Sequence, residues 1–409
     1  MDLPATTRPS QPTRPCWREI DTQAFRQNYR FLRALAGKDI ECLAIVKADA
    51  YGHGLGLCAP AGVEAGAQWL GVTSVEEGAA ASAACPSARI LVMGGAFPGQ
   101  GAELAANRLT PVVWDPLQID ELAALPGLPP ASLAVHLEID TGMSRQGVSL
   151  DDLPSLLARF TASGPLRLEA VMTHLYASDE ANGATTPAQL ARLERALSVI
   201  QATLPAAAPR PEFLSAGASA ALLGGEFREI GALANRFKLR PLLRLGLALY
   251  GVAPRFDPPF GSGLEAKILS NSLENLRPVL AWKTRVTSLR SIPAGAEVGY
   301  NGTFVATEPM RLALLPVGYA DGLDRRLGNR FSLLVRGQRA PLAGRISMDQ
   351  AVLDVTEIPD VAPGDEVVIL GTQGGETITA YDYADATETI PWEIFTRIAS
   401  RVPRVAVGL

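Results

Sequence analysis

The chain has 409 residues, of which 47% are hydrophobic and 19% charged, so it is long enough for two or three domains with cores of their own. Its formal net charge is −5, from 37 basic and 42 acidic residues without a basic cluster, which argues against a protein that binds nucleic acid or an anionic membrane. Chemistry on a small molecule is the default expectation for such a composition.

The N-terminal segment and the cysteines bear on the compartment. Residues 1–16, "MDLPATTRPSQPTRPC", are rich in Pro and Thr and lack an apolar stretch, which predicts a disordered tail rather than a signal peptide or a membrane anchor. The four cysteines show no metal-ligand spacing. We therefore expect a cytoplasmic protein with reduced thiols, no disulfide and no metal site.

Eight short apolar runs, rich in β-branched residues, come next, and most are followed by Ala- and Leu-rich helical stretches. Eight alternations of strand and helix over about 250 residues are typical of a (β/α)8 barrel of the TIM type. The sequence therefore predicts an α/β fold with such a barrel over residues 17–275. The eight runs are "LAIVKA", "WLGVTS", "ARILVMGG", "LTPVVWD", "LAVHLEID", "RLEAVMTHL", "PEFLSAGA" and "LLRLGLALYG".

The pattern changes after the barrel. The stretch 255–276 is rich in Pro, Gly and Ser, which predicts a connection with one short helix. Beyond it, strand-like segments alternate with Gly and Pro turns, so we expect a mostly-β C-terminal domain over residues 276–409. These segments are "VLAWKTRVTSLRSI", "EVGYNGTFVA", "RLALLPVGYADG", "FSLLVRG", "ISMDQAVLDV" and "DEVVILG".

Candidate functional residues gather at the carboxyl ends of the predicted strands, where TIM-type barrels carry their chemistry. Lys47 follows the apolar run "CLAIV" and is one of only five lysines. Small residues in "GASA" and "RLGL", at the last two strands, offer backbone N–H groups to a phosphate. A lysine, a phosphate cradle and a histidine around one rim predict a pyridoxal phosphate pocket, in which the lysine amine forms a Schiff base with the aldehyde. The residues at these strand ends are Lys47, Glu138, Asp140, Arg145, His174, Ser219, Arg244 and Gly246.

Motifs along nearly the whole chain resemble, in order, the signatures of the alanine racemase family. They are "AIVKADAYGHG", "HLEIDTGMSRQG", "VMTHLYASDE", "RLGLALYGVAP", "EVGYNGTFVA", "LPVGYADG", "GRISMDQ" and "RVPR". The resemblance implies a pyridoxal phosphate-dependent isomerase that interconverts L- and D-alanine and so supplies D-alanine for cell-wall peptidoglycan. It also implies a head-to-tail homodimer with shared active sites, and it assigns the strand "CWREID" to the β domain rather than to the barrel.

The resemblance further implies roles for single residues. Lys47 and the partner subunit's Tyr300 would be the two catalytic bases. Arg145 and the backbone N–H of Met348 would bind the substrate carboxylate, and Tyr319 would line the substrate entrance. Met348 and its neighbour Asp349 would also come from the partner subunit. The implied cofactor-binding residues are Lys47, Tyr51, Arg145, His174, Ser219, Arg244, Gly246 and Leu247.

Arg244 bears on the type of reaction. Many pyridoxal phosphate enzymes place a carboxylate at the pyridine nitrogen, which protonates the ring and makes it a strong electron sink. An arginine keeps its own proton, so a ring nitrogen beside Arg244 would stay unprotonated. Such a ring disfavours transamination and suits a racemase, which must return a proton to the same carbon. Tyr300 needs cationic surroundings to act as a base, and His174, Arg145 and Arg244 would supply them.

Each candidate also has an interpretation without function. Lys47 could pair with Asp49, and Ser219 could cap the helix that follows it. A turn former, an ion-pair partner, a core histidine and a strand aromatic are the corresponding interpretations of Tyr51, Arg244, His174 and Tyr300. The other two histidines, which we expect to be structural, are His53 and His136.

Other functions stay open on the sequence alone. A non-catalytic pyridoxal phosphate carrier would need only Lys47 and the phosphate cradle, but the β domain with Tyr300 argues against it. An amino-acid decarboxylase would be expected to carry an acid near the pyridine nitrogen and a catalytic cysteine in its β domain, and no cysteine lies beyond Cys85. A racemase of broader specificity, which also accepts serine, is the third alternative.

Three positions depart from the family pattern. Glu138 stands where many members carry a carbamylated lysine, and we expect its charge to hold Arg145 through a hydrogen bond. Ser400 stands where many members have a tyrosine that narrows the pocket, which predicts a relaxed preference that extends to serine. The remaining departures suggest no function: Ala218 in place of a frequent asparagine, and extra residues at 223–241 and 255–275.

Overall fold

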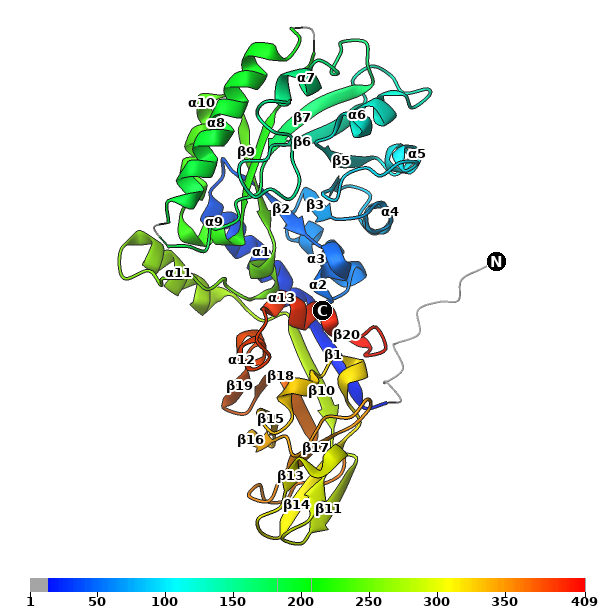
Figure 1. The fold of residues 1–409 in the computed structure, drawn as a ribbon, viewed down its shortest axis with the longest axis vertical. Helices are drawn as coiled ribbons and strands as arrows, with labels where there is room; N and C mark the ends of the chain where they lie inside the picture. The colour runs from blue at the N-terminus through cyan, green and yellow to red at the C-terminus, as the bar shows by residue number, and fades with distance from the viewer. Residues whose placement is uncertain (1–13, 182, 207, 409) are drawn as a thin grey trace. The chain divides into compact units, whose positions relative to one another are not determined.

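The computed structural model describes residues 14–181, 183–206 and 208–408 (Figure 1). The chain forms two compact units. The barrel unit comprises Ala24–Ala50 and Leu55–Arg277. The β unit comprises the described residues up to Gln23, the short segment Tyr51–Gly54, and the described residues from Pro278 onwards.

The limits of the two units differ from the predicted domain limits at the N-terminal end of the barrel. The barrel was expected over residues 17–275, and its unit begins instead at Ala24 because the segment before it pairs with strands of the β unit. Residues 1–13 of the predicted disordered tail lie outside the described residues. Cys16, at the end of that predicted tail, is part of a strand.

Eight parallel strands close the barrel, in the order in which they occur in the chain. The circle closes where Glu41 of the first strand pairs with Leu242 of the last. The strands are mostly apolar because both of their faces are covered. All eight predicted strands are confirmed. They are β2 (Glu41–Ile45), β3 (Trp69–Val72), β4 (Arg89–Val92), β5 (Leu109–Val113), β6 (Leu133–Glu138), β7 (Leu166–Met172), β8 (Phe213–Ala218) and β9 (Arg240–Leu245).

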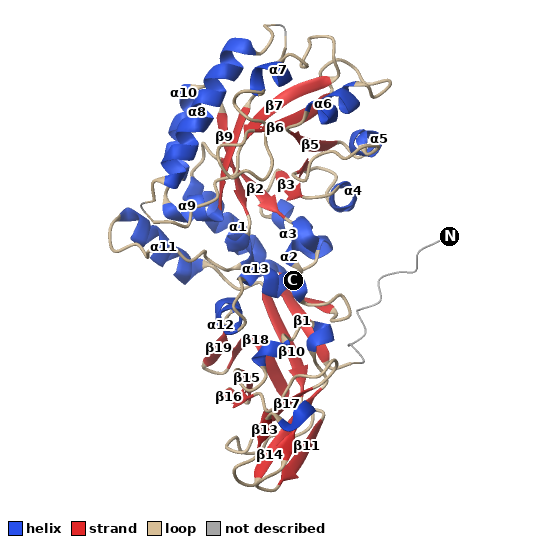
Figure 2. Ribbon diagram, viewed as in Figure 1, coloured by secondary structure: helices blue, strands red, loops and turns tan. Residues whose placement is uncertain are grey.

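Helices surround these strands, as the predicted alternation required (Figure 2). Sequence-local caps start several of them: the Ser74 hydroxyl accepts from the N–H of Glu77, and Asp115 with Gln118 forms a capping box. Within the described residues no helix is both long and apolar enough to cross a membrane. The helices are α1 (Thr22–Ala36), α3 (Leu55–Glu64), α4 (Val75–Ala84), α5 (Gly101–Ala106), α6 (Pro116–Ala123), α7 (Leu153–Leu157), α8 (Thr185–Thr203), α9 (Ser219–Gly224), α10 (Phe227–Arg236) and α11 (Leu264–Asn275).

A charged cluster surrounds the buried Glu169 among the barrel strands. Glu169 of β7 is ion-paired with Arg89 of β4 and, at 2.6 Å, with Arg167 of β7. Its second carboxylate oxygen lies 3.4 Å from Nε2 of His136, which is fully buried on β6. The Arg89 guanidinium also stacks on the Trp69 ring, 3.8 Å from its centre. His136 therefore belongs to the barrel interior, in agreement with its expected structural role.

The β unit is built on a sheet with the strand order β16-β15-β18-β10-β1-β20, and β19 adds to β18. β1 carries the sequence "CWREID" and lies between β10, which is antiparallel to it, and β20, which is parallel. This is the sheet that the family resemblance implied for "CWREID". The strands are β1 (Cys16–Asp21), β10 (Leu280–Arg285), β15 (Ser332–Val335), β16 (Gln338–Pro341), β18 (Glu366–Gln373), β19 (Glu376–Ile378) and β20 (Arg404–Val407).

Two smaller sheets and two helices complete the β unit. Trp282 of β10 is fully buried at the centre of the large sheet, where its indole N–H points at the Cys16 sulfur at 3.4 Å. All four cysteines are buried with free thiols. The further elements are β11 (Ser288–Ile292), β14 (Met310–Leu315) and β17 (Ala351–Asp354) in one sheet, β12 (Glu297–Val298) with β13 (Phe304–Val305) in the other, and the helices α12 (Ala380–Ala386) and α13 (Pro391–Arg397).

Candidate active site

One residue separates Lys47 from the end of β2, and Lys47 stands at the start of a left-handed turn, α2 (Lys47–Tyr51). Ala48, Asp49 and Ala50 have φ of 52°, 52° and 54°, a conformation that costs about 1–2 kcal/mol for each residue other than glycine. Local hydrogen bonds hold this strained backbone: the Ala50 N–H donates to the Val46 carbonyl at 2.8 Å, and the Asp49 carboxylate accepts from the Leu55 N–H at 2.7 Å. Strain that the fold maintains at a strand end is a common mark of a functional position.

The Asp49 carboxylate thus holds the turn, and the interpretation of Lys47 as its ion-pair partner gains no support. The pKa of Lys47 lies below its usual value of 10.5, first because the amine is largely buried and then because Arg145 and Arg244 add positive charge nearby. A lowered pKa increases the share of neutral amine near neutral pH. A neutral amine can attack an aldehyde or accept a proton.

Arg244 of β9 is buried and tied to the ends of the neighbouring strands. Its terminal nitrogens donate to the carbonyl and hydroxyl of Ser215, both at 2.9 Å, and to the Thr173 carbonyl at 2.8 Å. A further bond of 3.2 Å reaches Nδ1 of His174. Burial lowers the pKa of Arg244 to about 10, which still leaves the guanidinium charged at neutral pH.

His174 is neutral in this setting. Burial, followed by the charges of Arg244, Arg145 and Lys47, lowers its pKa to about 3. Because a guanidinium can only donate, Nδ1 of His174 must accept, and the ring proton sits on Nε2. The expectation that His174 adds positive charge to the site is therefore wrong, and the cationic surroundings come from the arginines.

Ser219 joins the loops that follow β8 and β9. Its buried hydroxyl accepts from the backbone N–H of Gly246 at 3.0 Å and of Ala248 at 3.3 Å. The N-cap position of α9 belongs to Ala218 and has no side-chain cap, so Ser219 is not the helix cap that the sequence allowed. Leu247 begins the 3-10 turn η1 (Leu247–Tyr250), into which the eighth predicted run continues. Ser219, Gly246 and Leu247 are thus brought together, as the predicted phosphate cradle requires.

Glu138 has a different partner from the predicted one. Its carboxylate accepts a hydrogen bond of 2.5 Å from the side chain of Gln146, which also donates to the Met93 carbonyl at 3.2 Å. Burial raises the pKa of Glu138, while the Gln146 bond and the charges of Arg244 and Arg145 oppose that rise. Arg145 is exposed and acts on Glu138 through its charge and not through a hydrogen bond.

Two polar residues organise the loops of this site: Asp140, which stood among the candidates at the strand ends, and Gln189, which did not. Asp140 accepts from the N–H groups of Gly142 at 2.8 Å and Ser144 at 3.1 Å, and so shapes the loop that carries Arg145. Gln189 of α8 is fully buried. It donates to the His174 carbonyl and to the Thr141 hydroxyl, both at 2.9 Å, and it accepts from the Tyr176 N–H at 3.1 Å. Gln189 therefore joins the loops after β6 and β7.

The other predicted site residues lie in the β unit. Tyr300 stands in the turn between β12 and β13, and its side chain is 66% exposed. Tyr319 and Met348 are 43% and 53% exposed, and their loops run side by side: the Tyr319 N–H donates to the Ser347 carbonyl, and the Ala320 N–H donates to the Met348 carbonyl, both at 3.0 Å.

Tyr51 and Ser400 complete the candidates in the β unit. The Tyr51 side chain is buried and its hydroxyl is hydrogen-bonded to Trp392, while burial raises its pKa. The next residue, Gly52, has φ of 77°, and a Cβ there would lie 2.3 Å from the Phe395 carbonyl, so no side chain fits. Ser400 is exposed, in the segment after α13.

Matches to known proteins extend over almost the whole chain. The family model "Alanine racemase, N-terminal domain" matches residues 20–254, and "Alanine racemase, C-terminal domain" matches residues 279–406. An alanine racemase from Halothermothrix orenii is 36% identical, over 96% of this chain and 97% of the relative. The chain belongs to the alanine racemase family. It is thus an enzyme of the amino-acid racemase class, and the resemblance predicted from its motifs is confirmed.

Solved structures of alanine racemases share the fold. The Bacillus anthracis alanine racemase with bound L-Ala-P superposes with a TM-score of 0.85, at 30% identity over 98% of this chain and 97% of that one. The Bartonella henselae alanine racemase, which holds covalently bound pyridoxal phosphate, gives a TM-score of 0.79 at 27% identity, over 96% and 99% of the two chains. The alanine racemase family is thus a pyridoxal phosphate-dependent family with this barrel and β domain.

Proposed function

We propose that this protein racemises alanine with pyridoxal phosphate held by Lys47. The observation that carries the proposal is the buried Arg244, whose guanidinium fixes a neutral His174 at the same strand ends as Lys47. Its terminal nitrogens are occupied by protein acceptors, and within the described residues no acceptor meets its Nε–H. That N–H is a donor for a basic ring nitrogen.

The residues of the barrel rim fit the cofactor. When bound, pyridoxal phosphate supplies an aldehyde that amines condense with and a conjugated ring that stabilises negative charge at the substrate Cα. Lys47 offers an amine with a lowered pKa, and the Ser219 hydroxyl, which accepts from the Gly246 N–H, can donate its own hydrogen to a phosphate. Arg244 would face the ring nitrogen. The proposed cofactor-binding residues are Lys47, Tyr51, Arg145, His174, Ser219, Arg244, Gly246 and Leu247.

The charge at Arg244 favours racemisation over transamination. With a pKa of about 10, the guanidinium holds its proton at neutral pH and donates only a hydrogen bond. Negative charge then stays closer to the substrate Cα, where a proton must return. An acid at this position would favour the competing reactions instead.

Inversion needs a base on each face of the substrate Cα. We assign one face to Lys47 and the other to the partner subunit's Tyr300, in a homodimer with shared active sites. From L- to D-alanine one base removes the Cα proton and the other delivers a proton to the opposite face; in the reverse direction the two exchange roles. The high exposure of Tyr300 is what a residue that serves a second subunit requires.

Arg145 and the Met348 N–H would bind the substrate carboxylate, and Tyr319 would line the entrance. The exposed Arg145 can reach an anion because Glu138 is already engaged by Gln146. We place the enzyme in the cytoplasm, as a source of D-alanine for peptidoglycan.

A racemisation assay tests the proposal. The purified protein is incubated with pyridoxal phosphate and a panel of L-amino acids, and the chirality of the products is measured directly. We expect D-alanine to form fastest, and a Lys47→Ala variant to form none. Decarboxylation, transamination or no turnover of alanine by a protein loaded with cofactor would overturn the proposal.

A further inference from the structure

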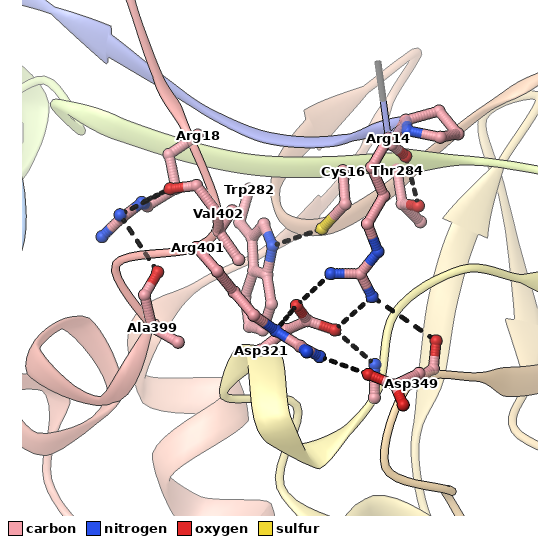
Figure 3. A network of polar contacts seen from close by, with 12 residues as sticks. Arg14, Cys16, Arg18, Trp282, Thr284, Asp321, Asp349, Ala399, Arg401 and Val402 are labelled. Atoms are coloured by element: carbon pink, nitrogen blue, oxygen red, sulfur yellow. Dashed lines mark hydrogen bonds and ion pairs between the residues drawn. The ribbon is translucent and has the colours of Figure 1, made fainter. Parts of the chain in front are cut away.

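A charged network in the β unit joins four segments that are far apart in the sequence (Figure 3). At its centre is Asp321, the last residue of the 3-10 turn η3 (Tyr319–Asp321), with a fully buried side chain. Two arginines meet it: Arg14, just before β1, and Arg401, just after Ser400. The fourth segment is the loop that carries Met348 and Asp349.

The contacts of Asp321 are charge-assisted and directional. Arg14 donates one hydrogen bond to each carboxylate oxygen, at 2.5 and 2.7 Å, and Arg401 donates to one of these oxygens through Nε at 2.7 Å. The remaining acceptor capacity takes the Gly318 N–H at 2.9 Å. Although burial alone would raise the pKa of Asp321, the hydrogen bonds from Arg14, Arg401 and Gly318 hold it below its usual value. Asp321 is therefore a fixed negative charge.

The same arginines extend the network to the neighbouring loop. Arg401 donates a second bond, of 2.7 Å, to the carboxylate of Asp349. Arg14 reaches the Asp349 carbonyl at 3.5 Å. The residue next to Asp349 is Met348. Arg14 through the backbone and Arg401 through the side chain therefore hold the residue beside the N–H that we assign to the substrate carboxylate.

The Tyr319 turn and the Met348 loop are also in direct contact. Besides the two backbone bonds from Tyr319 and Ala320, Gly318 approaches the Met348 loop so closely that a Cβ would lie 2.2 Å from the Ser347 carbonyl. Arg401 in turn is anchored at its base, because the buried Arg18 donates to the carbonyls of Ala399 and Val402, at 3.3 and 2.6 Å. The loops that present Tyr319 and Met348 thus depend on one carboxylate.

We propose that Asp321 is a positioning residue for the substrate: through Arg14 and Arg401 it fixes the Met348 N–H and the Tyr319 side chain, and so sets the affinity for the substrate carboxylate. This inference rests on the proposed function. Asp321 itself is buried behind the turn and touches neither the substrate nor the reacting atoms. The two proposed bases, Lys47 and Tyr300, make no hydrogen bond to the network within the described residues.

A matched pair of variants separates positioning from general stability. Asp321→Asn removes the charge and keeps the shape. The control, Asp324→Asn, changes a carboxylate three residues away that is also paired with arginines, Arg326 at 2.8 Å and Arg397 at 3.6 Å. In the part of the chain that the structure describes, Asp324 has no bond to the Met348 loop. Both holoenzymes are assayed for alanine racemisation, for the absorbance of bound cofactor and for amide hydrogen exchange.

We expect Asp321→Asn to raise KM for alanine about tenfold, as loss of a charge-assisted hydrogen bond does, with kcat within about threefold and full cofactor loading. Amide exchange should accelerate at Tyr319 and Ala320 and stay unchanged in β14. For Asp324→Asn we expect KM within about twofold of the parent. An unchanged KM in Asp321→Asn, or an exchange increase spread evenly over the β unit, would overturn the inference.

A second variant keeps the test open if Asp321→Asn does not fold. Arg401 is largely at the surface, so Arg401→Gln should fold, and it removes the bonds to Asp321 and Asp349 together. We expect KM to rise in Arg401→Gln and to recover in part in Arg401→Lys, because lysine restores the charge but cannot bind both carboxylates. If the parent does not racemise alanine, the proposed function fails; if the parent is active and these variants keep its KM, only the role of Asp321 fails.

Discussion

Glu169, buried among the barrel strands, makes the stability of the barrel unit depend on pH. Burial alone would raise its pKa, but the contact with His136 and the charge and hydrogen bond of Arg89 outweigh that and lower it to about 2, from a usual value of 4.5. A carboxyl group with a lowered pKa in the folded state stabilises the fold above its unfolded pKa. That stability is lost as the pH falls from about 4.5 towards 2.

The size of the effect follows from the shift. A fall of the pKa from 4.5 to about 2 corresponds to about 3 kcal/mol at neutral pH, at 1.36 kcal/mol for each unit. Because Arg89 and Arg167 are partly exposed to water, we expect about 2 kcal/mol. His136 also lowers the stability at acid pH. Burial lowers its pKa in the folded state, so below pH 6.5 the unfolded chain binds a proton at His136 that the folded chain does not bind.

Chemical denaturation of Glu169→Gln measures this contribution. At pH 7 the unfolding free energy of the variant should be about 2 kcal/mol below that of the parent. At pH 4 this difference should be smaller by about 1 kcal/mol, because Glu169 of the parent then begins to be protonated. The control is Glu212→Gln, which removes an exposed partner of Arg167, at 3.3 Å, and should cost less than about 0.5 kcal/mol. A gap that is absent at pH 7, or that widens on acidification, would refute the reasoning.

Three further outcomes follow from the site. Glu138→Gln should lower kcat/KM about tenfold, because the charge that engages Gln146 and faces the arginines is lost; an unchanged value would show that the charge is not needed. Ser400→Tyr should shift the ratio of alanine to serine kcat/KM towards alanine, by an amount on the order of 1 kcal/mol, and a ratio that does not move would show that Ser400 does not set the range. Mixed subunits of Lys47→Ala and Tyr300→Phe should regain part of the activity, because one of the two sites in a heterodimer is intact; no recovery after demonstrated exchange would place both bases in one chain.

The sequence predicted the barrel because its signal is local. A strand buried on both faces is mostly apolar, and eight such runs with helices between them leave few other folds. The end of the eighth strand was harder to predict, since "LALY" has the apolar character of a strand but folds as the 3-10 turn η1. The strand ends before Gly246. The N–H groups of Gly246 and Ala248 donate to the Ser219 hydroxyl and are therefore not available for pairing with a neighbouring strand.

The parts of the site that the sequence did not predict depend on contacts between distant residues. Gln189 lies outside the quoted motifs, and Gln146 lies inside one that assigned it no role. Each donates to a partner far away in the chain, Met93 for Gln146 and Thr141 for Gln189. The left-handed turn after Lys47 is built from alanines and an aspartate, which do not favour that conformation on their own. Asp321 stood inside a family motif, but its arginines come from the opposite ends of the chain.

The attachment of the cofactor to Lys47 tests the central claim most directly. The purified protein, loaded with pyridoxal phosphate, is reduced with borohydride, digested and mapped by mass spectrometry. The lowered pKa of Lys47 and its place at the end of β2 predict that the pyridoxyl group is found on this residue. A pyridoxyl group on any of the other lysines, Lys38, Lys238, Lys267 or Lys283, or none at all on a protein that racemises alanine, would contradict the account.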